Sequence, residues 1–262
     1  MTEIFLASLL LGILAGLAAG LFGIGGGALI VPILALLFQA HHFNPEQLML
    51  IAVATSLATA IFTSASSALT HHKLGNIDWR RTRHLAPSML LGASGGAVLA
   101  EFLSAGVLRW IFVSYLLYTS VQMALPKNSK TSTGPDRPYL DYPIGLLIGI
   151  LSAILGIGGG TMTVPYLAGN GLIMKNAVAT SSSCALPLAI SAAFSYAVLG
   201  WHNNQLPAGS FGYVYLPAFV GIVITSIFTA PIGARLAHRL PAQKLKRYFA
   251  TVLLAIAVKM AW

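Results

Sequence analysis

The chain has 262 residues, of which 56% are hydrophobic and only 8% are charged. This composition excludes an ordinary water-soluble domain of that length. Runs such as IFLASLLLGILAGLAAGLF are continuously apolar, whereas a transmembrane β-barrel needs strands of alternating polarity. The net charge of +9 comes from basic residues in short connections between apolar runs, where they set membrane orientation rather than bind nucleic acid. We therefore predict a helical polytopic membrane protein, because helices satisfy their own backbone hydrogen bonds in lipid.

The first predicted element, residues 4–38, is an apolar hairpin broken by the motif GIGGG at residues 23–27. The opening MTEIFL lacks the basic start and small-residue cleavage site of a signal peptide, so we interpret this run as part of the fold. Residues 126–140, rich in Pro, Gly, Ser and charge, predict a cytoplasmic linker. Between the hairpin and the linker, the helices expected to span the roughly 20 residues of a bilayer crossing are 47–70, 85–103 and 107–125.

The rest of the chain repeats this order, which indicates an internal duplication. In one match, GILAGLAAGLFGIGGGALIVPIL aligns with GLLIGILSAILGIGGGTMTVPYL, with GIGGG and the following proline in register. The matching segments begin at Gly12 and Gly145, at Ala52 and Ala177, and at Gly96 and Gly233. We therefore predict two transmembrane repeats, residues 1–125 and 141–262. The second is expected to contain a broken hairpin at 142–168 and helices at 176–199, 209–230 and 245–262.

Basic residues decide between two arrangements of these repeats, because Lys and Arg accumulate on the cytoplasmic side of a membrane. If each broken hairpin begins and ends on one side, the repeats are inverted. Thirteen of the 15 basic residues then share one face, leaving Arg109 and Lys259 on the other. If each broken segment crosses once, the repeats run parallel and the basic residues divide eight against seven. We predict an all-α fold of two inverted-topology repeats, each a glycine-broken helical hairpin plus three transmembrane helices. It is expected in a bacterial-type inner membrane, with both termini outside.

The glycine breaks form the first candidate substrate-binding site. Each glycine weakens a helix by about 1 kcal/mol relative to alanine, and a break at membrane depth needs protein neighbours or a water-filled cavity. A half-helix that starts after the break presents unpaired N–H groups and a positive dipole end, which suit an anion. The alternative is that the glycines only permit tight helix packing. The candidate residues are Gly25, Gly26, Gly27, Pro32, Gly158, Gly159, Gly160, Thr161 and Pro165.

Hydroxyl side chains form the second candidate set. Hydroxyls donate to sulfonate or carboxylate oxygens without the desolvation cost of a buried charge. The alternative for each hydroxyl is a hydrogen bond to the backbone or to a neighbouring helix. The members are Thr55 and Ser56 in the first repeat and Thr180, Ser181, Ser182 and Ser183 in the second.

The remaining reactive side chains indicate neither an enzyme nor a metal protein. The acidic residues lie near predicted helix ends, which argues against a carboxylate proton relay inside the membrane. Adjacent histidines at 41–42 and 71–72 are poorly spaced for one metal ion. Cys184 stands alone and forms no intrachain disulfide. GIGGG also lacks the Lys and Ser/Thr of a phosphate loop. We predict no catalytic residue, no metal site and no cofactor.

The duplicated GIGGG with a following proline, AVATS opening the next helix, and GAxLAxxL before a basic turn resemble the TauE/SafE sulfite-exporter-like family of membrane permeases. The resemblance covers nearly the whole chain. It implies transport of sulfite, sulfonates, sulfoacetate or related anions, with the glycine runs, the two prolines and the two Thr-Ser pairs as binding residues. Thr161 and Thr163 stand where the first repeat has Ala28 and Ile30, which predicts an asymmetric site.

From these features we expect a secondary transporter that moves a small anion by alternating access, its halves rocking about the paired half-helix ends. The expected partners are the anionic substrate, the lipid bilayer and, for a coupled transporter, H⁺ or Na⁺; no nucleic acid is expected. Two alternatives stay open. One is a channel-like facilitator for the same ions, and the other is a membrane scaffold that transports nothing.

Overall fold

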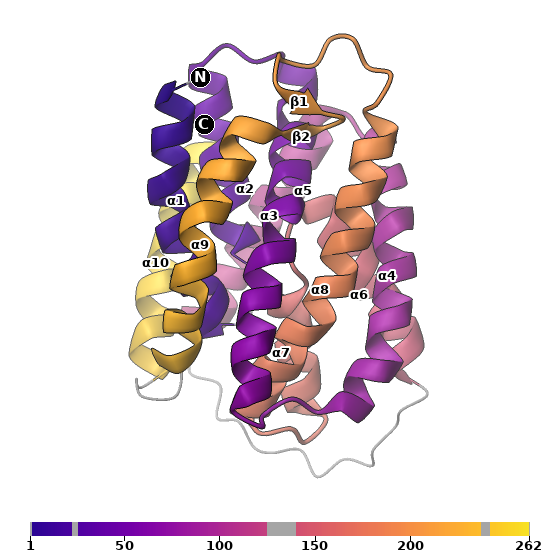
Figure 1. The fold of residues 1–262 in the computed structure, drawn as a ribbon, viewed down its shortest axis with the longest axis vertical. Coiled ribbons are helices and arrows are strands. Elements are labelled where there is room, and N and C mark those ends of the chain that lie inside the picture. Colours follow the sequence, from indigo (N-terminus) through magenta and orange to yellow (C-terminus); the bar gives the residue numbers. More distant parts are fainter. Residues whose placement is uncertain (1, 23–25, 125–139, 237–241, 262) are drawn as a thin grey trace.

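The computed structural model describes residues 2–22, 26–124, 140–236 and 242–261, and nearly all of them are helical (Figure 1). The predicted linker falls almost wholly outside these residues. The helices are α1 (Thr2–Phe22), α2 (Gly27–Ala40), α3 (Pro45–Lys73), α4 (Trp79–Phe102), α5 (Ala105–Ala124), α6 (Asp141–Leu155), α7 (Gly160–Gly169), α8 (Met174–Leu199), α9 (Leu216–Leu236) and α10 (Ala242–Ala261).

Five of these helices, α1, α3, α4, α8 and α9, are long and apolar enough to cross a membrane. This confirms the predicted all-α polytopic fold. The α2 helix has 14 residues and α7 has 10, which at 1.5 Å per residue falls short of the roughly 30 Å hydrocarbon core. Both are therefore half-helices, as expected of the segments that follow the glycine breaks.

Two predicted helix starts were wrong. The α4 helix begins at Trp79 rather than at residue 85, because the Asp78 carboxylate accepts the N–H of Arg81 at 3.1 Å and caps the first turn. The α9 helix begins at Leu216 rather than at residue 209, because an antiparallel pair of short strands precedes it, β1 (Ser210–Phe211) and β2 (Val214–Tyr215). The hairpin uses Gly212 at φ +54°, a left-handed conformation that a helix excludes.

The two halves of the chain interleave instead of forming separate bundles. The α1 helix packs most extensively on α9 and α6 on α4, while α3 packs on α8 and α5 on α10. Helices matched by the duplication therefore have matched partners. A Cβ added to Gly16 of α1 would lie 2.9 Å from the Ser226 carbonyl oxygen, and one added to Gly149 of α6 would lie 2.3 Å from that of Met89. Such close backbone approach is typical of membrane helices with small residues at their interfaces.

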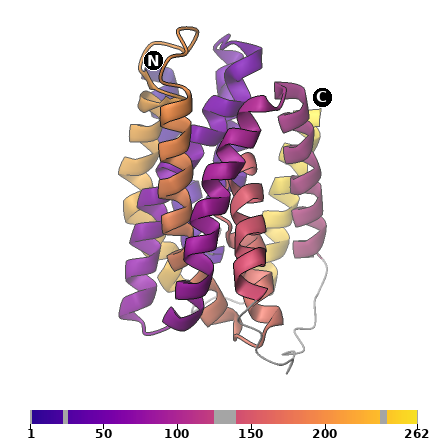
Figure 2. The ribbon, with the colours of Figure 1, turned by 90° about the vertical axis from the view of Figure 1, so that its right-hand side faces the viewer.

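The matched helices α3 and α8 run in opposite directions along the bundle. The α3 helix ends and α8 begins at the lower end of the molecule in Figure 1. The α1 helix begins and α10 ends at the upper end, in both Figure 1 and Figure 2. Each broken hairpin, α1–α2 and α6–α7, also returns to the end from which it started (Figure 1).

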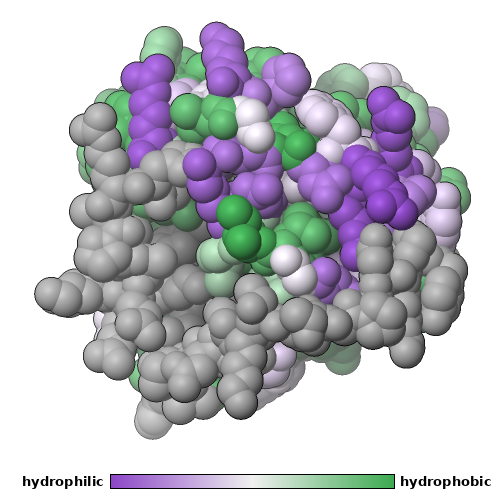
Figure 3. Space-filling view, turned by 90° about the horizontal axis from the view of Figure 1, so that it is seen from below, coloured by the Kyte–Doolittle hydropathy of each residue, from purple (hydrophilic) through white to green (hydrophobic). Residues whose placement is uncertain are grey.

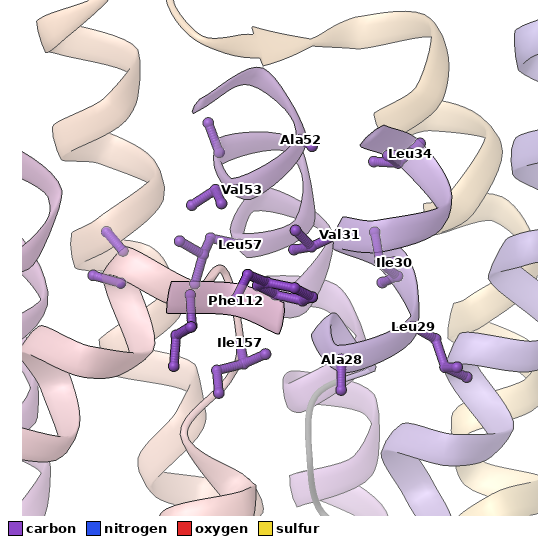
Figure 4. Close-up of a cluster of buried hydrophobic side chains, with 14 of the residues drawn as sticks. Ala28, Leu29, Ile30, Val31, Leu34, Ala52, Val53, Leu57, Phe112 and Ile157 are labelled. Carbon is purple, nitrogen blue, oxygen red and sulfur yellow. The ribbon is translucent and has the colours of Figure 1, made fainter. Parts of the chain in front are cut away.

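Apolar side chains fill the centre of the bundle around the helix breaks (Figure 4). Val31 of α2, Leu57 of α3, Phe112 of α5 and Ile157 of the α6–α7 connection gather there, and each is fully buried. Gly26 and Gly27 of the first break and residues 156–160 of the second are buried, so this described backbone lies inside packed protein, where non-helical backbone at membrane depth is tolerated.

Candidate functional site

The second glycine break places the start of α7 inside the protein. The α6 helix ends at Gly156 with φ +69°, and α7 begins after Gly159 with φ +74°. Both angles are readily adopted only by glycine. The Gly159 carbonyl accepts the N–H groups of Met162 and Thr163, whereas Gly159, as the N-cap residue of α7, has no side chain that could cap the helix. The first N–H groups of the half-helix therefore have no intrahelical acceptor.

The first break has the same geometry where the structure describes it. The α2 helix begins after Gly26, whose φ is +78°, again without a side-chain cap. Gly25 lies outside the described residues. Both repeats thus start a short helix from a left-handed glycine at matched positions, and each start carries the positive end of a helix dipole.

The two breaks touch each other. A Cβ added to Gly27 would lie 2.3 Å from the carbonyl oxygen of Gly156 and 2.8 Å from the Cα of Ile157. The Ser56 hydroxyl donates to the same Gly156 carbonyl at 2.7 Å. The start of α2 therefore lies directly against the end of α6. Gly27 permits this close helix packing, which was the alternative to substrate binding for the glycine residues.

Two polar side chains, Ser152 and Thr161, lie at the start of α7 beside the apolar side chains of Met89 and Leu188. Ser152 of α6 is fully buried, and its hydroxyl has no hydrogen-bond partner among the described residues. A Cβ added to Gly159 would lie 3.3 Å from Ser152 Oγ, so this hydroxyl faces the start of the half-helix. The hydroxyl of Thr161, in the first turn of α7, accepts a hydrogen bond from Tyr115 of α5. An unpaired buried hydroxyl costs about 1–3 kcal/mol, a cost that a bound anion would remove.

Sequence reasoning missed Ser152 and Tyr115. The signal for Ser152 was present in the duplication, because the first repeat has Ala19 at the matched position. A serine that appears in only one repeat marks an asymmetry in the same way as Thr161. Tyr115 carries no comparable signal, since only the packing of α5 brings it to α7.

The two candidate prolines shape the half-helices. Pro32 is buried in α2, whereas Pro165 is exposed on α7. Proline has no N–H, so the carbonyls four residues earlier, those of Ala28 and Thr161, lose their helical donors. The prolines thus supply no donor to the first turn, and the N–H groups suited to an anion come from the glycine segments.

The candidate threonines make matched hydrogen bonds to the backbone. Thr55 Oγ1 accepts the N–H of Tyr215, directly before α9, at 3.0 Å. Thr180 Oγ1 accepts the N–H of Asp78, directly before α4, at 2.9 Å. Each threonine therefore anchors the start of a helix from the other half of the chain. This is the backbone role that the sequence left open as an alternative to substrate binding.

The candidate serines that follow Thr180 are buried in α8. Ser182 donates to the Val178 carbonyl at 3.1 Å, and Ser183 to the Thr180 carbonyl at 2.7 Å. Ser181 is buried in the same turn. Ser182 also accepts a hydrogen bond from Ser67 of α3 at 3.3 Å, and Ser183 Oγ lies 2.8 Å from Thr82 Oγ1 of α4. Ser182 and Ser183 therefore lie between helices.

A buried ion pair holds the far end of α7. Arg81 Nη1 lies 2.8 Å from Asp141 Oδ1 and 2.9 Å from its Oδ2, and Tyr166 of α7 donates to Oδ1 at 2.6 Å. Arg81 is 4% exposed and Asp141 is 0% exposed. The sequence placed both residues near helix ends but did not predict that they pair. The network ties the starts of α4 and α6 to α7.

The helices are apolar, and two of them are broken at matched glycine turns whose half-helix starts are buried at the centre. This arrangement defines a multi-pass membrane protein with the broken helices typical of secondary transporters. The sequence profile described as sulfite exporter TauE/SafE matches residues 8–260. A Haemophilus influenzae protein described as a probable membrane transporter protein is 41% identical over 99% of this chain and 99% of its own length. Methanocaldococcus jannaschii has a similarly described relative, 28% identical over 94% of this chain and 91% of its own length. No solved structure matches the chain significantly.

The chain therefore belongs to the sulfite exporter TauE/SafE family of membrane transporters. This confirms the resemblance that the repeated GIGGG and AVATS motifs indicated.

Proposed function

We propose that this protein is a secondary transporter that moves a small anion, such as sulfite, a sulfonate or sulfoacetate, across an inner membrane by alternating access. The observation that carries the proposal is the buried start of α7, whose first N–H groups have no intrahelical acceptor. The Ser152 hydroxyl lies beside Gly159 at this start and has no hydrogen-bond partner among the described residues. The matched start of α2 lies against Gly156, the residue at which α6 ends before this break. Two helix dipoles and a hydroxyl stabilise an anion without a buried cation.

Inverted halves provide the machinery for alternating access. The exchange of helix partners between the halves and the opposite directions of α3 and α8 in Figure 1 support this arrangement. Hydrophilic residues gather on the described part of the lower end (Figure 3). The described helix ends on that side carry Lys73, Arg80, Arg81, Arg83, Lys175 and Arg235. Because basic residues accumulate in the cytoplasm, this end is cytoplasmic in our proposal.

The packed centre favours alternating access over a channel. Phe112 and Ile157 fill the space beside the start of α2 (Figure 4) and are buried. A channel-like facilitator needs a continuous aqueous path through this region, whereas a transporter requires a closed state that blocks it. In our proposal, movement of one half against the other separates these side chains and exposes the site to one side at a time.

Flux measurements in proteoliposomes test the function. The panel consists of sulfite, sulfoacetate, thiosulfate, sulfate and small carboxylates, with and without gradients of H⁺ or Na⁺. We expect saturable, gradient-dependent flux of one of these anions. A folded protein that moves none of them would refute the proposal and favour the scaffold alternative.

The variant Ser152→Ala tests the site. A hydrogen bond to a charged ligand contributes about 1.5–3 kcal/mol, so we expect KM to rise about 10- to 100-fold. Ser88→Ala is the matched control, because Ser88 is a buried serine whose hydroxyl donates to the Leu85 carbonyl of its own helix at 3.0 Å. Equal KM values for the two variants would remove Ser152 from the site.

A further inference from the structure

A basic pocket lies between the C-terminal turns of α3 and α9, at the end of the molecule opposite the start of α1. Its volume is about 350 Å³. Two cations line it, one from each helix, together with two hydroxyls and three apolar residues. The lining residues are Ser66, Leu69, Thr70, Lys73, Leu74, Pro231 and Arg235.

No carboxylate in the described part of the chain neutralises the charges in this pocket. No carboxylate is among the lining residues, and neither Lys73 nor Arg235 forms an ion pair within the described part of the chain. The hydroxyl hydrogens are already used, since Ser66 donates to the Ile227 carbonyl at 3.0 Å and Thr70 to the Ser66 carbonyl at 2.9 Å. The two cations are therefore the donors left for a ligand, and they select an anion.

Apolar side chains beside the pocket indicate that this anion belongs to a lipid. Leu69 of α3 and Phe228 and Ile232 of α9 are large apolar residues that remain 52% to 73% exposed. Phe228 and Ile232 are four residues apart and so share one face of α9. On a membrane helix such a face contacts acyl chains. A soluble anion would use the cations alone, whereas a phospholipid would use the cations and the apolar groove together.

The duplication supplies an internal comparison. Ser191 donates to the Leu90 carbonyl at 2.7 Å, which repeats at matched positions the bond from Ser66 to Ile227. The framework of the pocket is therefore present at both ends of the molecule. The positions that match Lys73 and Arg235, however, are Val198 and Val98, and both valines are exposed. The two cations are therefore present at one end of the molecule only.

We propose that the groove between the C-terminal turns of α3 and α9 binds an acidic phospholipid of the cytoplasmic leaflet. Lys73 and Arg235 bind the headgroup phosphate, and the acyl chains lie along Leu69, Phe228 and Ile232. Basic pockets between transmembrane helices on the cytoplasmic side are suited to such headgroups. The inference does not depend on which anion the protein transports.

Native mass spectrometry of the full-length protein, stripped of lipid and supplied with phosphatidylglycerol or phosphatidylcholine, tests this site. We expect tight binding of phosphatidylglycerol and a loss of affinity of about 25-fold in the double variant Lys73→Gln/Arg235→Gln, at roughly fivefold for each basic residue. The control Arg83→Gln/Lys175→Gln removes the same charge from exposed positions at the same end and should keep the affinity. Equal losses in both double variants would overturn the proposal, because binding would then follow the net charge of this face.

Two further measurements distinguish a lipid site from a site for a free anion. Inorganic phosphate should not displace the lipid, and full displacement by phosphate would identify a free-anion site instead. The gain-of-function variant Val98→Arg/Val198→Lys changes two exposed residues and rebuilds the pocket at the other end. It should raise the number of tightly bound acidic lipids from one to two. An unchanged number would show that the groove and its cations do not make a lipid site.

Discussion

Replacing Gly27 by alanine tests the contact between the two helix breaks. Gly27 is the first residue of α2, and a Cβ there would lie 2.3 Å from the Gly156 carbonyl oxygen and 2.8 Å from Ile157 Cα. Both atoms belong to the backbone, so no side chain can rotate away to make room. The Ser56 hydroxyl donates to the same carbonyl at 2.7 Å, so moving that carbonyl also disturbs this bond.

The expected loss follows from three contributions. Overpacking of a tight core costs about 1–3 kcal/mol, and weakening one hydrogen bond costs about 0.5–1.5 kcal/mol. The higher helix propensity of alanine returns about 1 kcal/mol. We therefore expect Gly27→Ala to lower the free energy of unfolding by about 0.5–3.5 kcal/mol and to slow anion flux, because it pushes the start of α2 away from the end of α6.

The assay pairs thermal unfolding of the purified protein with flux in proteoliposomes. Gly95→Ala is the matched control, since Gly95 lies within α4 and a Cβ there would meet nothing within 4 Å. This control should leave flux unchanged and stability equal or slightly higher. If Gly27→Ala were as stable and as active as Gly95→Ala, the inferred contact between the breaks would be wrong.

Three further substitutions probe the rest of the site. Gly159→Leu should abolish flux while the protein still inserts into the membrane. The reason is that a φ of +74° is strained for leucine and that the leucine side chain would occupy the start of α7. Flux at the wild-type rate would contradict this prediction. Thr180→Val should destabilise the start of α4 by about 0.5–1.5 kcal/mol without changing KM, since Thr180 accepts the Asp78 N–H. A raised KM would instead identify Thr180 as a substrate ligand. Asp141→Asn should cost about 3–5 kcal/mol in an unfolding assay because the buried Arg81 loses the carboxylate that pairs with it. The double variant Arg81→Met/Asp141→Leu should recover most of that loss, and a double variant as unstable as Asp141→Asn would refute this account.

The sequence by itself determined that the chain crosses a membrane, that it is duplicated, and where its half-helices start. These features depend on local properties. Long apolar runs prefer lipid wherever they pack, and glycines at 23–27 and 156–160 interrupt a helix through their own backbone freedom. Repeated motifs can be read directly from the amino-acid sequence. The family resemblance therefore rests on the same repeated glycine and AVATS motifs.

Only the tertiary structure decided what each polar side chain does. Thr55 and Thr180 were expected near the substrate, and they accept backbone N–H groups from helices of the other half. Ser152 gave little signal alone, and it matters because α6 packs its hydroxyl against Gly159. Arg81 and Asp141 are 60 residues apart and pair because α4 lies against α6. Hydrogen bonds and ion pairs depend on distances of a few ångströms between segments remote in sequence, and helix packing sets those distances.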